Sequence, residues 1–451
     1  MSADQDVVEA DGYHVPAEVY RRLDEAGAAR RAEIAHSLIA AHPRELLALP
    51  WLDGRRANLR GAPLADATLQ LADLRGADLR EADLAGAVLG QANLEGALLE
   101  QASLPGADLA SAVLRGAALA EANLREALLE DADLSDAGLR FADLRAAALE
   151  GANLQRADLH GAKAEGAILT GADLRGAHLG EASLRDADLT RADLRDADLR
   201  SADLRGARLG GANLRGAVLT GCDLGDAVLA EAELQSVDLS RCILARTYWS
   251  GVWLDKTRLR RDQLGDAIGE EVAGDFVAAA GGYLALERNF IDLGDSDAGT
   301  WAYGKRRRMA KLAARRKARD ALRAHAWRTT ARETIRASAA QLVEWVCDYG
   351  ESIPRVLLSI LAVYLVYTLL YGLTGSVLHV DTLRDGTTRY VTRDPREWAI
   401  FSLFAITTSG NPSIGLLPSG EGVQLLTGSE AFLGIFLTGL LGFVAGNQIR
   451  R

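Results

Sequence analysis

Cysteine, methionine and proline are scarce in this chain: its 451 residues include 3 cysteines, 2 methionines and 9 prolines. Three cysteines in so long a chain do not make a disulfide framework, so free thiols in a reducing compartment are expected. The 7 histidines are scattered, and the sequence has no zinc-ligand spacing and no phosphate-binding glycine loop. The sequence therefore predicts no metal site and no cofactor, and it argues against an enzyme.

Charge and length set further limits. The 51 lysines and arginines against 62 aspartates and glutamates give a formal net charge of -11, which disfavours a general nucleic-acid binder. A chain of this length is too long for one core, so two to four domains are expected. The acidic start, Met1 to Asp4, has no apolar run behind it, which predicts that no secretory signal peptide is present.

What the chain does have is a five-residue repeat. Leucine occupies every fifth position from Leu59 to Leu259, and only Ala164 and Trp249 break this rule. A small residue, usually alanine, stands two positions before each leucine, and Asp or Asn often stands between them. A period of five fits neither an amphipathic helix nor a plain strand, but it fits a square coil with leucine and alanine inside. Stacked at a strand spacing of roughly 4.8 Å, about ten such coils predict a rod on the order of 50 Å long.

These units closely resemble those of the pentapeptide-repeat family. The resemblance implies an all-β solenoid, a right-handed quadrilateral β-helix, over residues 57–261. Outside, Asp often precedes the leucine and Arg follows it, as at Asp193 and Arg195, which favours a solvated, ion-paired surface. In another branch of the family the rod mimics DNA and binds topoisomerase, which needs a continuous acidic face, and the interleaved arginines argue against it. Docking of an unidentified protein or ligand on the rod stays open.

Three inward positions depart from the repeat. Cys222 and Cys242 replace the inward alanine twenty residues apart, so one is expected to stack on the other as a small-residue substitution. Ala164 replaces a leucine between Leu144 and Leu184, and a buried Leu-to-Ala change costs roughly 2–5 kcal/mol. A void or a thinned coil is therefore expected at Ala164.

The segments that flank the repeat differ from it. Residues 1–56 are predicted to form a helical N-terminal cap, because the open edge of the first coil would otherwise pair with other chains. Residues 262–352 are predicted to form a helical, basic linker. Its basic cluster consists of Lys305, Arg306, Arg307, Arg308, Lys311, Arg315, Arg316, Lys317, Arg319 and Arg323.

Residues 353–451 have the composition of a membrane domain. The apolar runs 354–373 and 431–446 are predicted to be membrane spans. The basic cluster lies before the first run and Arg450 and Arg451 follow the second, so the positive-inside rule places both termini in the cytoplasm. A multi-pass protein of the bacterial cytoplasmic membrane is expected.

A short helix is predicted between the spans, over 395–406. Asp394 is a typical N-cap residue, Pro395 suits the first helical position, and Glu397 suits the third. The helix is too short to cross a bilayer, and irregular backbone follows it. Such backbone is tolerated at membrane depth only if it is buried in protein or lines water. The partly negative C-terminus of the helix favours a cation there.

A span, a capped half-helix, the Thr-Thr-x-Gly sequence and a second span together resemble the two-span pore domain of the potassium-channel superfamily. The resemblance implies a homotetramer with an ion filter at residues 407–412. The filter residues would be Thr407, Thr408, Ser409, Gly410, Asn411 and Pro412. Candidate gating hinges in the second span are Gly434, Gly439 and Gly442.

The filter departs from that superfamily at Pro412, where a glycine is usual. Proline cannot adopt the backbone conformation that glycine supplies. A weakly selective pore for monovalent cations is therefore expected. The whole chain resembles bacterial pentapeptide-repeat proteins that carry a C-terminal two-span channel domain, with the rod as a cytoplasmic scaffold or sensor. The alternative is a membrane-anchored scaffold, or a protein-binding, DNA-mimic-like module, without conduction.

Overall fold

The computed structural model describes residues 7–10, 13–16, 55–56, 58–323, 327–347, 352–375, 377–383, 386–407, 416–418 and 421–449. The chain divides into two compact units, Met1–Met309 and Ala310–Arg451. At the start, β1 (Val7–Ala10) and β2 (Tyr13–Pro16) pair as an antiparallel hairpin. The helices predicted for the rest of 1–56 lie outside the described residues.

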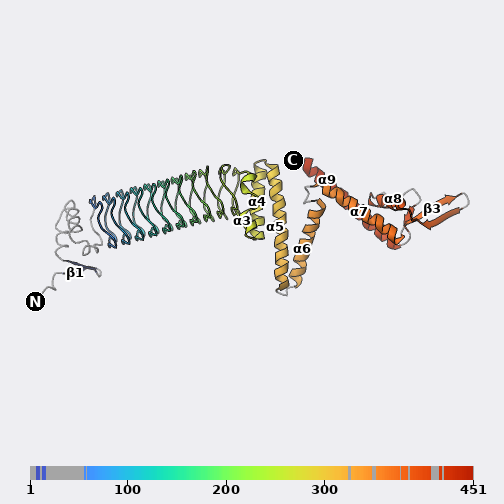
Figure 1. Cartoon of the computed structure of the whole chain (residues 1–451), viewed down its shortest axis with the longest axis horizontal. Helices are drawn as coiled ribbons and strands as arrows, with labels where there is room; N and C mark the ends of the chain where they lie inside the picture. Colours follow the sequence, from blue (N-terminus) through green and yellow to red (C-terminus); the bar gives the residue numbers. More distant parts are fainter. Residues whose placement is uncertain are drawn as a thin grey trace. The chain divides into compact units, whose positions relative to one another are not determined.

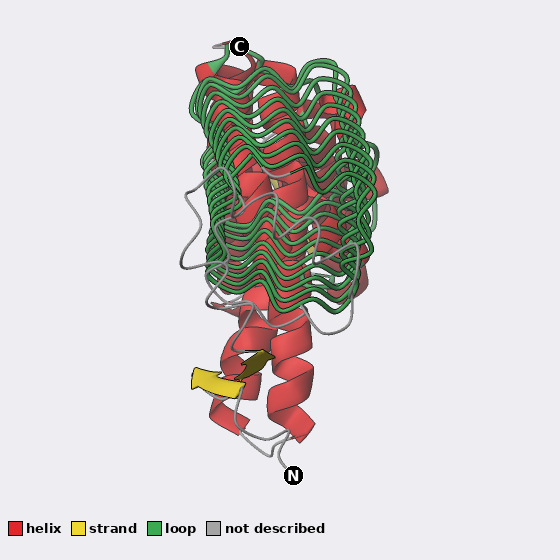
Figure 2. Ribbon diagram, turned by 90° about the vertical axis from the view of Figure 1, so that its left-hand side faces the viewer, coloured by secondary structure: helices red, strands yellow, loops and turns green. Residues whose placement is uncertain are grey.

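The repeat forms a solenoid whose coils stack in parallel, with bridges between residues that stand just before the inward leucines and lie twenty positions apart. The bridges run from Asn58↔Asp78 to Asp238↔Arg258. Figure 1 shows the stack from blue to green, and Figure 2 shows the same coils from one end. Every leucine of the series from Leu59 to Leu259 is at most 6% exposed, so the predicted inward phase is confirmed.

The outward residues of the repeat fit the turn at each corner. The residue two positions after almost every leucine has a positive φ, for example 65° at Gly176 and 58° at Asp196. Glycine adopts this left-handed conformation without strain, and Asp tolerates it. The Asp that precedes the leucine binds the backbone locally: Asp173 Oδ1 accepts a hydrogen bond of 3.2 Å from the amide of Arg175.

Polar side chains replace the small inward residue near the end of the rod. Each donates a hydrogen bond to the carbonyl of a leucine on the previous coil. The pairs are Cys222–Leu199 at 2.7 Å, Cys242–Leu219 at 3.0 Å, Thr247–Leu224 at 3.0 Å and Thr257–Leu234 at 2.6 Å. The cysteines therefore point inward as expected, and no metal is needed to explain their position.

Helices close the C-terminal end of the rod (Figure 1). They are η1 (Arg261–Leu264), α3 (Gly269–Val272), α4 (Phe276–Asp292) and the start of α5 (Ser296–Arg323). Glu270 Oε1 accepts hydrogen bonds of 2.6 Å from the amides of both Trp249 and Ser250. The Asn289 side chain accepts from the Thr257 amide at 3.1 Å and donates to the Thr257 carbonyl at 2.8 Å. These side chains replace the backbone partners that a further coil would supply.

A second set of contacts holds the cap in place. Gln263 Nε2 donates to the carbonyls of Leu239, at 2.8 Å, and Cys242, at 2.6 Å. Tyr283 is fully buried and donates to Glu271 Oε2 at 2.5 Å, and Lys305 Nζ lies 3.1 Å from the same oxygen. Part of the segment expected to be a linker is thus the cap of the rod.

The second unit combines helices with a small sheet. Its helices are α6 (Trp327–Cys347), α7 (Ile353–Thr374), α8 (Pro395–Ile406) and α9 (Glu421–Ile449). Strands β3 (Val377–Leu383), β4 (Gly386–Val391) and β5 (Leu416–Pro418) form an antiparallel sheet in the order β4-β3-β5. This sheet was not predicted from the sequence.

Two helices of this unit, over Ile353–Thr374 and Gln424–Gly446, are long and apolar enough to cross a membrane. The second apolar segment begins before residue 431, where the sequence analysis placed its start. Helix α9 continues through Glu430, the charged residue just before that position.

Candidate functional site

The candidate site is the half-helix α8 and the backbone that follows it. Asp394 caps α8, with Oδ1 accepting from the Arg396 amide at 2.8 Å. Trp398 anchors the first turn because its indole Nε1 donates to the carbonyl of Thr392 at 3.0 Å. Gly372 of α7 lies against the Trp398 ring, where an added Cβ would collide with it. The start of α8 is therefore fixed by both local capping and packing on α7.

An aromatic core lies between α7, α8 and the sheet. Tyr371 and Phe401 meet edge to face, with ring centroids 5.0 Å apart. Val377 of β3 and Leu416 of β5 complete this buried cluster, and Trp398 packs against it. The sheet thus packs against α8 and completes the hydrophobic core that α8 shares with α7.

Helix α9 approaches the other end of α8 closely. At Gly434, an added Cβ would collide with the carbonyl of Ile406, the last residue of α8. At Gly439 and Gly442 nothing lies within 4 Å of an added Cβ. Gly434 is therefore a packing contact, because a larger residue would push α8 and α9 apart. A hinge at Gly439 or Gly442 stays a prediction.

Thr407 is the one predicted filter residue that the structure describes. It is the C-cap of α8, with φ of -87° and ψ of 6°, and its amide donates to the Leu403 carbonyl at 3.2 Å. Its hydroxyl donates to the same carbonyl at 2.7 Å. The other predicted filter residues lie outside the described residues: Thr408, Ser409, Gly410, Asn411 and Pro412.

Glu430 is a buried acid that the sequence analysis missed. Its Oε2 accepts a hydrogen bond of 2.6 Å from Tyr371 of α7, and its Oε1 contacts the hydroxyl of Ser402 of α8. All three side chains are fully buried. A single acid inside a long apolar run is itself a signal of function in a membrane segment, and this signal could have found it.

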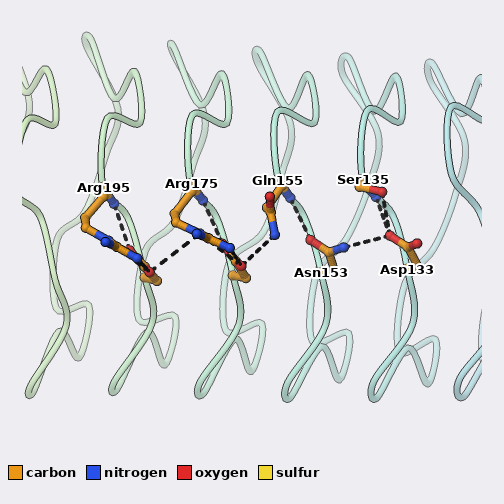
Figure 3. Close-up of polar contacts among 8 residues, drawn as sticks. Asp133, Ser135, Asn153, Gln155, Arg175 and Arg195 are labelled. Carbon is orange, nitrogen blue, oxygen red and sulfur yellow. Dashed lines mark hydrogen bonds and ion pairs between the residues drawn. The ribbon is translucent and has the colours of Figure 1, made fainter.

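One column of the rod surface is a ladder of polar contacts, in which Arg–Asp pairs continue a row of uncharged hydrogen-bonding side chains (Figure 3). Arg175 Nη2 lies 2.6 Å from Asp173 of its own coil, and Arg175 Nε lies 3.7 Å from Asp193 of the next coil. The hydrogen bonds from Arg175 lower the pKa of Asp173. Arg195 forms the same pair with Asp193 at 2.6 Å. Along this edge the acidic groups are neutralised by neighbouring arginines.

Cys222 and Cys242 are free, buried cysteines. Among the described residues, no group of three or more His, Cys, Asp and Glu side chains could hold a metal ion. Burial raises the pKa of the Cys242 thiol to about 12 and that of Cys222 further. Both thiols are therefore protonated and poor nucleophiles.

Comparison with known proteins identifies the rod. Residues 55–246 match the family described as pentapeptide repeats, in 8 copies. HetL, a pentapeptide repeat protein involved in heterocyst differentiation regulation in the cyanobacterium Nostoc sp. strain PCC 7120, is 36% identical. The match covers 42% of this chain and 87% of HetL, with a TM-score of 0.23. This chain is a pentapeptide-repeat protein.

Two further pentapeptide-repeat structures are similar to part of this chain. Full-length QnrB1, a plasmid-mediated fluoroquinolone resistance protein, is 20% identical over 40% of this chain and 86% of its own, with a TM-score of 0.21. A pentapeptide repeat protein from the thylakoid lumen of Arabidopsis thaliana is 36% identical over 22% of this chain and 66% of its own, with a TM-score of 0.15. No curated protein matches the chain.

Proposed function

We propose that this pentapeptide-repeat protein is a membrane ion channel, a homotetramer with a weakly selective pore for monovalent cations. The main support for this proposal is the half-helix α8, which packs between the two apolar helices α7 and α9. Its 12 residues span about 18 Å, well short of a hydrocarbon core of about 30 Å. Its last residue, Ile406, packs against Gly434 within the second apolar window, which supports an end of α8 inside the membrane region, where a helix C-terminus favours a cation.

The exposed surfaces of α7 and α9 support a membrane location and an oligomer. Only 11% of the first apolar window and 22% of the second are buried within the chain. Large apolar side chains such as Leu358, Leu369 and Phe432 are more than half exposed. Exposing these apolar faces to water would cost free energy, whereas lipid or other subunits can cover them. Two spans cannot enclose a conduit alone, so several copies are required, and the channel resemblance favours four.

The charge distribution supports the orientation. The basic residues of α5 precede the first span, which by the positive-inside rule supports a cytoplasmic location for both termini and the rod. The rod then serves as a scaffold or sensor for the pore. Its alternating charges make a solvated surface, with no continuous acidic edge along the column of Asp173 and Asp193.

The filter assignment rests on sequence. Carbonyls from Thr408 to Asn411 would replace the hydration shell of the ion, which requires regular backbone. Pro412 fixes its own φ and restricts the residue before it, so the regular filter ends near Gly410. No carboxylate lies between Thr407 and Pro412. A pore with few narrow sites distinguishes sodium from potassium poorly.

Reversal potentials of the full chain in planar bilayers test this proposal. We expect a cation-selective current with similar permeability to potassium and sodium, lost in Gly410→Asp. Gly116→Asp is the matched control, because Gly116 is a rod corner with φ of 62° where Asp is common and nothing lies within 4 Å of an added Cβ. Preference for potassium by about a hundredfold refutes weak selectivity. A chloride current, or unchanged current in Gly410→Asp, refutes the cation pore.

The alternative is a membrane-anchored scaffold or protein-binding module without conduction. It predicts an integral membrane protein that need not assemble and that passes no ion under any gradient. The same bilayer measurement therefore separates the two functions. The mass of the detergent-purified protein adds a second test, because a tetramer is required only by the pore.

A further inference from the structure

Glu430 occupies a position where an acid is costly. Its side chain is fully buried between α7, α8 and α9, in a segment that lies within the proposed membrane span. An unpaired charge in such a place is strongly unfavourable, so buried acids are paired, or carry a proton. The partners of Glu430 therefore decide which state the site can hold.

Two of these partners are hydroxyl groups. Tyr371 donates to Oε2 at 2.6 Å, and Ser402 Oγ contacts Oε1. Ser402 Oγ also lies 3.2 Å from the backbone carbonyl of Tyr364 in α7. A serine hydroxyl has one proton, so it can donate to Glu430 or to Tyr364 but not to both.

The count of protons favours a neutral acid. If Glu430 carries a proton on Oε1, it donates to Ser402, and Ser402 donates onward to Tyr364. Tyr371 still donates to Oε2, so every hydroxyl proton in this series of hydrogen bonds has an acceptor. If Glu430 is ionised, Ser402 must turn its proton to the acid and leave the contact with Tyr364. Only the protonated acid completes a relay from α9 through α8 to α7.

In the part of the chain that the structure describes, no positively charged side chain is paired with Glu430 to compensate an ionised acid. From α7, the titratable groups beside the site are Tyr371 and Tyr367, and Tyr367 shares a hydrogen bond of 2.8 Å with Ser429. On α8, the described charged side chains lie in its first turn, where Glu397 is 3.0 Å from His379 of β3. Glu397 precedes Ser402 by five residues, which is a distance of about 8 Å along the helix axis. Among the described residues, no ion pair of Glu430 with a cation is present.

We propose that Glu430 is a proton-bearing positioning residue that fixes the half-helix α8 between the two spans. This inference rests on the proposed channel function. Ser402 lies five residues before Thr407, so a shift of α8 at Ser402 moves the start of the filter with it. Loss of the relay loosens α8, and ionisation of Glu430 rearranges the relay that joins the three helices.

The test combines ion flux with infrared spectroscopy on the full chain in liposomes. Glu430→Gln has the shape and hydrogen-bonding groups of the protonated acid, so we expect its flux to stay within about twofold of wild type. Glu430→Ala and Ser402→Ala each break the relay, and we expect a loss of about tenfold or more. Thr438→Ala is the control, because its hydroxyl bonds only within α9, to the carbonyl of Gly434 at 2.7 Å.

Two further measurements distinguish a positioning role of Glu430 from a role that only stabilises the fold. Flux of the wild type should fall as pH is raised, while flux of Glu430→Gln should not. The carbonyl stretch of a protonated carboxyl should be present in wild type at neutral pH and missing in Glu430→Gln. That band does not depend on conduction.

Each outcome decides a different proposal. If the wild type passes no ion but shows the band, the channel function fails and the protonated site stands. If the band is absent, or if Ser402→Ala conducts like wild type, the positioning role is wrong. A tenfold loss in Glu430→Gln would mean that the ionised acid is required, which also overturns the inference.

Discussion

Asn289 provides the sharpest test of the cap on the rod. Its side chain is 2% exposed and binds both backbone groups of Thr257, at 3.1 Å for the amide and 2.8 Å for the carbonyl. In Asn289→Ala both bonds are lost. The Thr257 amide keeps its bond of 2.7 Å to Leu254, but the carbonyl loses the partner that the cap provided.

The cost follows from these contacts. A hydrogen bond contributes about 1 kcal/mol, and a buried carbonyl without a partner costs about 1–3 kcal/mol. The cap should therefore be destabilised by about 2–4 kcal/mol. Because a solenoid coil contacts only its neighbours, the effect should stay in the last coil rather than unfold the rod.

Hydrogen exchange on the full chain measures this effect. Amides of the last coil, residues 239–258, should exchange about 30- to 1,000-fold faster in Asn289→Ala, while the middle of the rod is unchanged. The control is Asn213→Ala, since Asn213 accepts one exposed hydrogen bond of 3.2 Å from Arg215. Unchanged exchange of the last coil, or equal effects of the two variants, would show that Asn289 does not close the rod.

Three further outcomes test the rod. Ala164→Leu should leave the melting temperature unchanged or raise it, because Ala164 is buried in a stack of leucines; a loss of several degrees would show that the coil is already filled. In a Cys347→Ser background, maleimide labelling of Cys222 and Cys242 should be slow, since both thiols are buried; rapid labelling of the folded chain would contradict the inward phase. Hydrogen bonds from Arg205 lower the pKa of Asp203 below its usual value. The stabilisation is therefore complete above about pH 4 and lost as pH falls below it, so the acid-induced drop in melting temperature should be smaller in Asp203→Asn than in wild type.

The inside of the rod could be predicted because each coil repeats the same local rule. Leucine and alanine at a fixed period determine which residues face inward, and the structure confirms this even at Cys222 and Cys242. The cap could not be predicted in the same way. Glu270 and Asn289 bind residues 21 and 32 positions earlier, and such pairs leave no periodic pattern in the sequence.

The second unit shows the same division. The bounds 395–406 were predicted from neighbouring residues, Asp394 and Pro395, and α8 has these bounds. The β3–β5 pairing joins Val377 to Pro418, far apart along the chain, and it was not predicted. Glu430 was not predicted as a candidate residue, and its partners on α7 and α8 are visible only in the folded chain.

The fixed twenty-residue coil has a geometric consequence for anything attached to the rod. Deleting one whole coil would bring the two ends about 4.8 Å closer without turning one against the other. Deleting a single five-residue side would instead turn everything beyond it by a quarter of a revolution, with hardly any change in length. The number of whole coils therefore sets the distance between the two ends of the rod. The number of additional five-residue sides sets the rotation of one end relative to the other.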